Sequence, residues 1–252
     1  GLRRQRLDRP YLRRDGKLQA VSWNEAFQAI AEATNGVPGA AVAAIAGDLA
    51  DCESMLALKD LMTALGSNNI DCRQDGSKLD ARVRCSYLFN TSIAGIERAE
   101  ALVLVGCNPR LEAPVLNARI RKRWAAGNFN VGVIGPKADL TYPTVPAGTS
   151  AKDLEAMASG QGDFAKVLKK AKRAMIILGQ GALMGEDGAA VLNLARQAAD
   201  KLGMIKSGWN GFNVLHTAAA RVGGLDLGFV PGEGGRDVAG ILAGTQSSSI
   251  KI

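Results

Sequence analysis

Short, wholly apolar runs alternate with segments of helical periodicity along most of the chain. The runs lie at residues 40–47, 101–106, 130–136 and 174–181, and each has the pattern expected of a strand buried on both faces. Apolar residues recur every three to four positions in the segments between them, which predicts helices at 48–66, 113–127, 153–160, 164–173 and 188–203. This alternation predicts parallel strands joined by right-handed helical crossovers, and therefore an α/β fold.

The first part of the chain has a different pattern. Pro10 favours an extended backbone before it, and DGK at 15–17 predicts a tight turn between two short extended pieces. Ser22 and Glu25 have the spacing of a capping box, which predicts a helix start. The apolar face of that helix comprises Trp23, Ala26, Phe27, Ile30 and Ala31. We therefore expect a short extended arm or hairpin followed by a capped helix.

Three parts are expected along the chain. Residues 1–36 form the basic arm, turn and capped helix, and 37–147 form a first Rossmann-like α/β lobe. Residues 148–252 form a second α/β lobe, which we expect to be truncated because the final SSSIKI has the pattern of a strand start. The boundary is placed in the stretch TYPTVPAGTS, which has two prolines and a polar end.

Composition and charge exclude several classes of protein. Of 252 residues, 47% are hydrophobic and 22% are charged, which is ordinary for a packed globular protein. No apolar run reaches the roughly 18 residues that span a bilayer, and no secretory leader is evident. We therefore expect a soluble protein, which does not exclude docking to a membrane complex. The net charge is +7, but no aromatic residues interleave the basic clusters, so nucleic-acid binding is not expected.

The predicted strands end in residues that would allow a ligand to approach. Ligands of open α/β sheets lie beyond the carboxyl ends of the strands, where glycine lets them come close to the backbone. The candidates for such a cleft are Gly47, Gly106, Asn108, Pro109, Gly179 and Gly181. Tight turns use glycine for their own reasons, and GQGALMG differs from the dinucleotide pattern GxGxxG. A nucleotide-binding domain is one alternative left open by this motif.

Reactive side chains are few. His216 is the one histidine, and we expect it on a helix. Cys52, Cys72, Cys85 and Cys107 form no CxxC pair, so we predict no metal site and no catalytic residue. Acidic residues after the first strand, Asp48, Asp51 and Glu53, are expected at a helix N-terminus because they complement the helix dipole.

Several stretches together resemble a known family. RLDRPYLRRDGKLQAVSWNEA resembles a segment of the molybdopterin oxidoreductases, and the strand and GCNP turn within FNTSIAGIERAEALVLVGCNPRLEAPVLNARIRKRW resemble the next landmark of that family. The motifs APVLNARIRK, DLTYP and GWNGFNVLHTAAARVGGLDLGFVPG look more specifically like the G-type (75-kDa-type) subunits of NADH-quinone oxidoreductase, respiratory complex I. The match covers nearly the whole sequence.

This resemblance implies a function and a set of partners. The complex transfers electrons from NADH through iron–sulfur clusters to quinone and couples this to proton translocation. The region would be a non-catalytic scaffold with the Rossmann-like lobes of the molybdopterin oxidoreductase type, and the iron–sulfur clusters would belong to an amino-terminal part not included in it. Expected partners are other peripheral-arm subunits, at the cytoplasmic face of a bacterial inner membrane or the mitochondrial matrix side, without membrane insertion.

The family resemblance also bears on the cofactor. In catalytic relatives a Cys, selenocysteine or Ser ligates the metal shortly after a strand like NNID, whereas neither Cys72 nor Cys85 falls in a matching motif here. We therefore expect no cofactor in this region and only a vestigial cleft. The alternative is a molybdopterin-dependent oxidoreductase domain with its cofactor bound.

Overall fold

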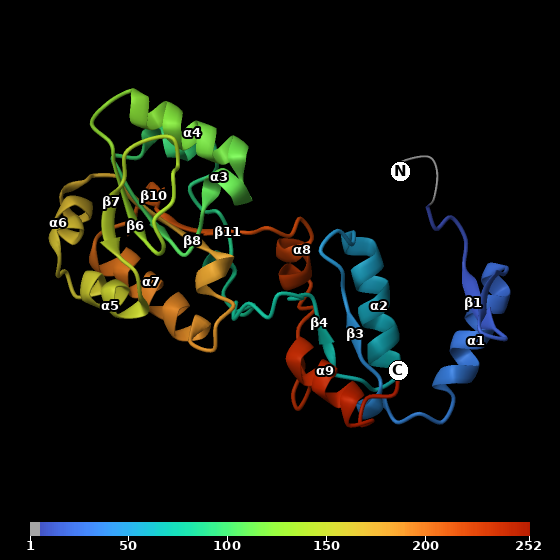
Figure 1. Ribbon diagram of the computed structural model, residues 1–252. Helices are drawn as coiled ribbons and strands as arrows, with labels where there is room; N and C mark the ends of the chain where they lie inside the picture. The colour runs from blue at the N-terminus through green and yellow to red at the C-terminus, as the bar shows by residue number, and fades with distance from the viewer. Residues whose placement is uncertain (1–5) are drawn as a thin grey trace. The chain divides into compact units, whose positions relative to one another are not determined.

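The computed structural model describes residues 6–252 and divides them into two compact units (Figure 1). Unit 1 comprises the described residues up to 44, together with 57–71 and 231–252, and unit 2 comprises 45–56 and 72–230. Arg3 and Arg4 of the predicted basic arm lie outside the described residues. This division differs from the predicted boundary at 147/148, because strands from both sides of that point share one sheet in unit 2.

A five-stranded parallel sheet forms the centre of unit 2, in the order β11-β8-β5-β6-β7. Its strands are β5 (Ala101–Val105), β6 (Asn130–Ile134), β7 (Val145–Gly148), β8 (Ala174–Gly179) and β11 (Phe212–Leu215). Every residue of β5 and β8 is buried, which matches the apolar runs and is typical of a parallel sheet covered on both faces. The α/β prediction is therefore confirmed.

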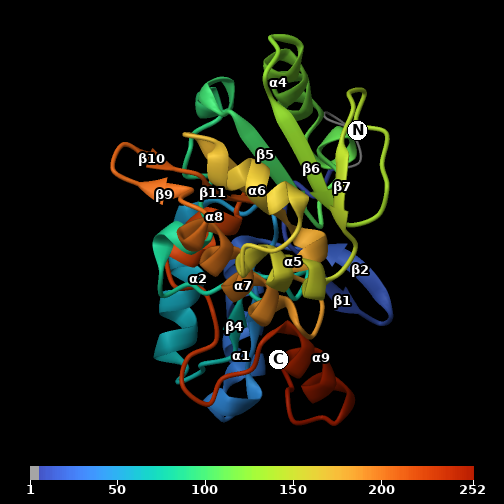
Figure 2. The ribbon, with the colours of Figure 1, turned by 90° about the vertical axis from the view of Figure 1, so that its left-hand side faces the viewer.

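Helices cover both faces of this sheet (Figure 2). One face carries α5 (Ala151–Ala158), α6 (Asp163–Lys170) and α7 (Gly188–Lys201). The other carries α3 (Pro109–Glu112) and α4 (Pro114–Ala125), where Leu116 and Ile120 pack with Leu102, Leu104 and Met175 in one buried cluster. Pro114 separates the two helices, so the helix predicted at 113–127 is preceded by one further turn.

Shorter elements complete unit 2. They are β9 (Ile205–Lys206), β10 (Trp209–Asn210), α8 (Arg221–Asp226) and the 3₁₀ turns η2 (Arg84–Ser86), η3 (Ala94–Arg98) and η4 (Gln180–Ala182). The helix α2 (Cys52–Ala64) and the strand β3 (Ala44–Ile45) contribute residues to both units.

Unit 1 contains the predicted hairpin and capped helix. Strands β1 (Tyr11–Arg14) and β2 (Lys17–Ala20) pair antiparallel, and both turn residues between them, Asp15 and Gly16, have positive φ. In α1 (Trp23–Thr34) the Ser22 hydroxyl accepts from Glu25 N, and the Glu25 carboxylate accepts from Ser22 N at 2.9 Å. The remaining elements are η1 (Gly39–Ala41), β4 (Ile70–Asp71) and α9 (Val238–Gln246).

Two predicted elements differ from the structure. The run at 40–47 contains only the two strand residues of β3, because the segment before it is a 3₁₀ turn in which Gly39 lies against the carbonyls of Leu65 and Gly66. The prediction of a helix around His216 is wrong. The preceding FNVL forms β11, paired with β8, and His216 lies directly after this strand.

Candidate functional site

A cleft of about 370 Å³ lies at the carboxyl ends of β5 and β6, beside η4. Its walls include Gly106, Gly135 and Gly181 from the turns, and Thr149 and Ser150 from the start of α5. After β5 the chain adds β6 and then β7 on one side of β5, and afterwards adds β8 and then β11 on its other side. This reversal of strand order is the place where α/β sheets bind ligands.

The structure brings together two of the six predicted cleft residues, Gly106 and Gly181. Gly179 faces Cys107 instead, and Asn108 caps α3 by accepting a hydrogen bond from Arg110 N at 3.2 Å. Pro109 is the buried first residue of α3. Gly47 lies elsewhere in unit 2, beside the side-chain amide of Gln74.

Close packing of two turns explains why Gly106 and Gly181 have no room for a side chain. Gly106 has a φ of +57°, and a Cβ there would lie 2.4 Å from the Cβ of Ala182. A Cβ on Gly181 would lie 2.8 Å from the carbonyl oxygen of Gly106. The turns after β5 and β8 therefore lie against one another, and their glycines serve that contact whether or not a ligand is present.

The electrostatics of the cleft do not favour a phosphate. Two backbone amides just before α5 are already used, because Asp153 Oδ2 accepts from Thr149 N at 2.8 Å and from Ser150 N at 2.9 Å. Hydrogen bonds from the Thr149 backbone, and then from Ser150, hold the pKa of Asp153 below its usual value. Asp187 places a carboxylate in the lining of the cleft, and none of the described lining residues is Lys or Arg. A phosphate would therefore meet a carboxylate and would find two of the amides near this helix start already engaged.

The same residues do not fit a molybdopterin cofactor, which carries a phosphate and binds its metal through sulfur. Cys107 follows β5, but its Sγ lies 3.8 Å from the Ile177 carbonyl oxygen. Burial raises the pKa of the Cys107 thiol well above its usual value, and the nearby Glu112 adds to this effect. A thiol that stays protonated is a poor metal ligand.

A buried cation lies in a second polar cluster of unit 2, around α8. The side chain of Arg221 is 1% exposed. Its Nη1 donates to Asp75 Oδ1 at 3.0 Å and to Ser77 Oγ at 2.8 Å, and its Nε donates to the Cys72 carbonyl oxygen at 3.1 Å. Asp48 completes the set at 3.4 Å from Nη2. The guanidinium is thus neutralised and held entirely by the protein.

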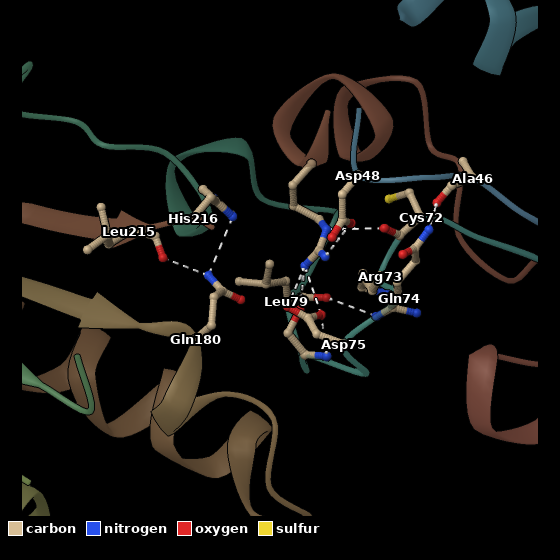
Figure 3. Close-up of polar contacts among 12 residues, drawn as sticks. Ala46, Asp48, Cys72, Arg73, Gln74, Asp75, Leu79, Gln180, Leu215 and His216 are labelled. Carbon is tan, nitrogen blue, oxygen red and sulfur yellow. Dashed lines mark hydrogen bonds and ion pairs between the residues drawn. The ribbon is translucent and has the colours of Figure 1, made fainter. Parts of the chain in front are cut away.

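Asp75 is the more buried of the two carboxylates. Its side chain is 19% exposed, against 43% for Asp48. Burial opposes ionisation of Asp75, but the Ser77 backbone N–H and the Arg221 guanidinium together outweigh it and hold the pKa of Asp75 below its usual value. Figure 3 shows Asp48, Cys72 and Asp75 gathered in this cluster.

His216 and Gln180 lie close to each other beside the cluster (Figure 3). His216 Nε2 lies 2.6 Å from the Tyr87 carbonyl oxygen, and its Nδ1 lies 3.5 Å from Gln180 Nε2. Burial lowers the pKa of His216, so the ring is neutral and its Nε2–H donates to Tyr87. Gln180 Nε2 donates to the Leu215 carbonyl oxygen at 2.8 Å, while Gln180 Oε1 is buried without a hydrogen-bond partner among residues 6–252.

The remaining candidates for chemistry are engaged in packing or capping. Cys72 is buried against Gly224 of α8, and Cys85 is exposed in η2. Asp51 Oδ1 accepts a hydrogen bond from Ser54 N at 2.7 Å at the start of α2, where its position predicted an acidic residue. Within residues 6–252, no group of three or more His, Cys, Asp or Glu side chains is placed to hold a metal ion. Sequence reasoning missed Arg221, although a single arginine among the small residues of AAARVGG was a usable signal.

A family model described as molybdopterin oxidoreductase matches residues 6–246. The chain belongs to the molybdopterin oxidoreductase family. Its parallel sheet and flanking helices agree with this assignment.

Curated relatives of the chain include proteins named as parts of NADH-quinone oxidoreductase or NADH dehydrogenase. The chain is 45% identical to the G subunit of NADH-quinone oxidoreductase from Rickettsia conorii over 91% of its length. It is 44% identical to the mitochondrial NADH dehydrogenase [ubiquinone] iron-sulfur protein 1 of Solanum tuberosum over 92% of its length. The chain spans about a third of these relatives, 34% and 31% respectively. Among the described residues, no helix combines the length and apolar character needed to cross a bilayer.

Proposed function

We propose that this chain is a non-catalytic scaffold region of a G-type subunit in an NADH:quinone oxidoreductase. As a whole, that complex would transfer electrons from NADH through iron–sulfur clusters to quinone. The similarity to relatives of the G type along 91% of the chain supports the placement. The scaffold role rests on one observation: the buried ionic cluster of unit 2 is saturated by the protein's own contacts.

This saturation is clearest at Arg221. A cation intended for a substrate or a cofactor would keep part of its donor set free, but Arg221 is 1% exposed and spends its donors on Asp75, Ser77 and the Cys72 carbonyl. Such a group holds segments together and has no access to a ligand. We therefore assign the cluster to fixing α8 onto the loop after β4.

The iron–sulfur clusters would be held by another part of the full-length subunit. The partners would be peripheral-arm subunits, at the cytoplasmic face of a bacterial membrane or on the matrix side of a mitochondrial one. The chain itself would contribute no cofactor ligand and no membrane-inserted segment.

Filling the cleft tests the scaffold role. Ala151 lines the cleft as the first residue of α5, and the larger side chain in Ala151→Leu would occupy space that a cofactor needs. In the full-length protein we expect this variant to assemble and to support the same NADH:quinone activity as the wild type, with Ala151→Gly as the matched control. Normal assembly with lost activity in Ala151→Leu alone would contradict the proposal.

A molybdopterin-dependent oxidoreductase domain is the second candidate. The family match over residues 6–246 favours it. The Asp187 carboxylate in the cleft and the raised pKa of the Cys107 thiol argue against it. Stoichiometric molybdenum or tungsten with a pterin in the full-length protein would establish this second function.

A further inference from the structure

The outer side of α3 and α4 forms a surface that neither the cleft nor the Arg221 cluster uses. Its exposed residues are Leu111, Pro114, Val115, Ala118, Arg121 and Lys122, which we call the α3–α4 face. Leu111 is 77% exposed and Val115 is 83% exposed, one at the end of α3 and the other at the start of α4. Large aliphatic side chains that are this exposed on consecutive elements are characteristic of interaction surfaces.

The exposure of this face follows from firm packing on its opposite side. Leu116 and Ile120 are buried in the core of unit 2. Asn117, on the same inner side, donates to the Leu140 carbonyl oxygen at 3.1 Å and accepts from the Tyr142 hydroxyl at 2.8 Å. Because these contacts fix the rotation of α4, Val115 and Ala118 cannot turn inward.

Charge divides the face into two halves. The first half, from Leu111 to Ala118, is apolar, and the second half presents Arg121 and Lys122. The residues of α4 include four cations and no carboxylate. Glu97 of η3 is shared by Arg119 at 2.9 Å and Lys122 at 3.2 Å, so one carboxylate meets two cations and the surface keeps a positive surplus.

We propose that the α3–α4 face is the docking surface for an acidic protein, another subunit of the same complex. The partner has an aliphatic pocket that receives Leu111 and Val115, and carboxylates at its edge that meet Arg121 and Lys122. An apolar centre with charges at the rim is the usual anatomy of a protein interface. This inference rests on the proposed function, because it assumes that the chain works within a multi-subunit assembly.

The side chains of the α3–α4 face favour a protein partner over a membrane or a nucleic acid. A helix that lies in a membrane interface has an apolar face along its length, usually with Trp or Phe, whereas here the apolar part is confined to one end and contains no aromatic residue. Single-stranded nucleic acids are bound by aromatic side chains that stack on the bases. Two aliphatic side chains beside two cations suit a protein with an acidic rim.

Photocrosslinking in the intact complex tests the partner directly. A benzoylphenylalanine in place of Ala118, at the centre of the face, is compared with the same group in place of Glu155, which is exposed on α5. The expected product joins position 118 to an acidic segment of a different polypeptide. A product within the same polypeptide, or no product above the Glu155 control, would overturn the proposal.

Charge and apolar variants of the full-length protein provide the second measurement. Val115→Asp should weaken the association of the full-length protein with the complex about tenfold or more, since loss of an interface hot spot lowers affinity by at least that factor. Arg121→Glu should also weaken association and reduce its dependence on salt concentration. Ile205→Asp, a change at another exposed aliphatic residue, is the control and should have no effect.

The variants are first checked for folding by thermal unfolding, which should match the wild type because positions 115 and 121 are exposed. Unchanged association of folded Val115→Asp and Arg121→Glu would refute the docking surface while leaving the proposed function intact. A wild-type protein that never joins the complex would refute both.

Discussion

At the scale of single residues, the buried guanidinium of Arg221 is the centre of a set of buried polar contacts in unit 2. Transfer of a charge to a protein interior is costly unless it is paired and hydrogen-bonded, and Arg221 meets both conditions through Asp75 and Ser77. The partners come from the segment after β4, far from α8 in the sequence. A residue of this kind stabilises one arrangement of the chain because its removal leaves an unpaired carboxylate.

The first prediction concerns this unpaired charge. Arg221→Met should lower the free energy of unfolding by about 3–5 kcal/mol, since breaking a buried ion pair from one side leaves Asp75 without its counter-ion. Chemical denaturation measures the change. The pair Arg82–Asp80, whose arginine is exposed, provides the control, and Arg82→Met should have a much smaller effect. Equal losses of unfolding free energy for the two substitutions would show that the buried Arg221 cluster stabilises the protein no more than the Arg82–Asp80 pair does.

The second prediction concerns pH. The folded-state pKa of His216 lies below the unfolded value of about 6.5, so the unfolded chain binds more protons in the interval between them. The stability contributed by neutral His216 is therefore complete above about pH 6.5 and is lost as the pH falls below it, with a slope of up to about 1.4 kcal/mol per pH unit.

His216→Gln isolates this effect because the chain has one histidine and the new amide can still donate to Tyr87. Unfolding free energies measured between pH 7.5 and 5.5 should fall for the wild type and remain nearly constant for the variant. Parallel pH profiles for the two proteins would exclude His216 as the titrating group.

At the scale of elements, the contact between the turns after β5 and β8 shapes the cleft. Gly106 is required there by two independent conditions, a φ of +57° and the approach of Ala182. The spacing of the turns therefore depends on the absence of a single Cβ.

The third prediction separates these two conditions. Gly106→Ala should destabilise the protein by about 2–4 kcal/mol, because backbone strain adds to a steric clash. Gly127→Ala has only the strain, since its φ is +84° with no atom near the added Cβ, and it should cost about 1 kcal/mol. Thermal unfolding of both variants gives the comparison, and a Gly106 variant no less stable than the Gly127 variant would refute the tight contact.

The sequence predicted those elements whose signal is local. The hairpin turn at Asp15 and Gly16 and the capping box of α1 follow from neighbouring residues, and the buried strands β5 and β8 follow from uninterrupted apolar runs. The helix predicted around His216 failed because pairing with β8, a contact between distant residues, fixes FNVL as a strand. Asp75 and Arg221 lie 146 residues apart, so no local pattern could join them.

The structure gathers only part of the predicted set of cleft residues. Strand order decides which βα turns meet at one place, and that order placed Gly106 and Gly181 together but left Gly47 elsewhere. The position of Asp187 in the cleft lining and the hydrogen bonds of Asp153 at the start of α5 were not predicted, since both residues resemble ordinary acidic residues near helix starts.

At the scale of the whole molecule, the chain combines the fold of the molybdopterin oxidoreductase family with a cleft whose Asp187 carboxylate opposes an anionic cofactor. Arg221 is buried and paired within unit 2, and burial lowers the pKa of His216 beside it. Under the proposed function, such a body would provide stability and docking surfaces, while other parts of the assembly would supply the chemistry.

The fourth prediction tests this central claim most directly. Elemental analysis for molybdenum and tungsten, together with pterin fluorescence after oxidation, is carried out on the full-length protein purified anaerobically in its complex. Neither metal nor pterin should be present in stoichiometric amount, while the complex oxidises NADH with quinone. One equivalent of molybdenum or tungsten with a pterin per subunit would contradict the scaffold role.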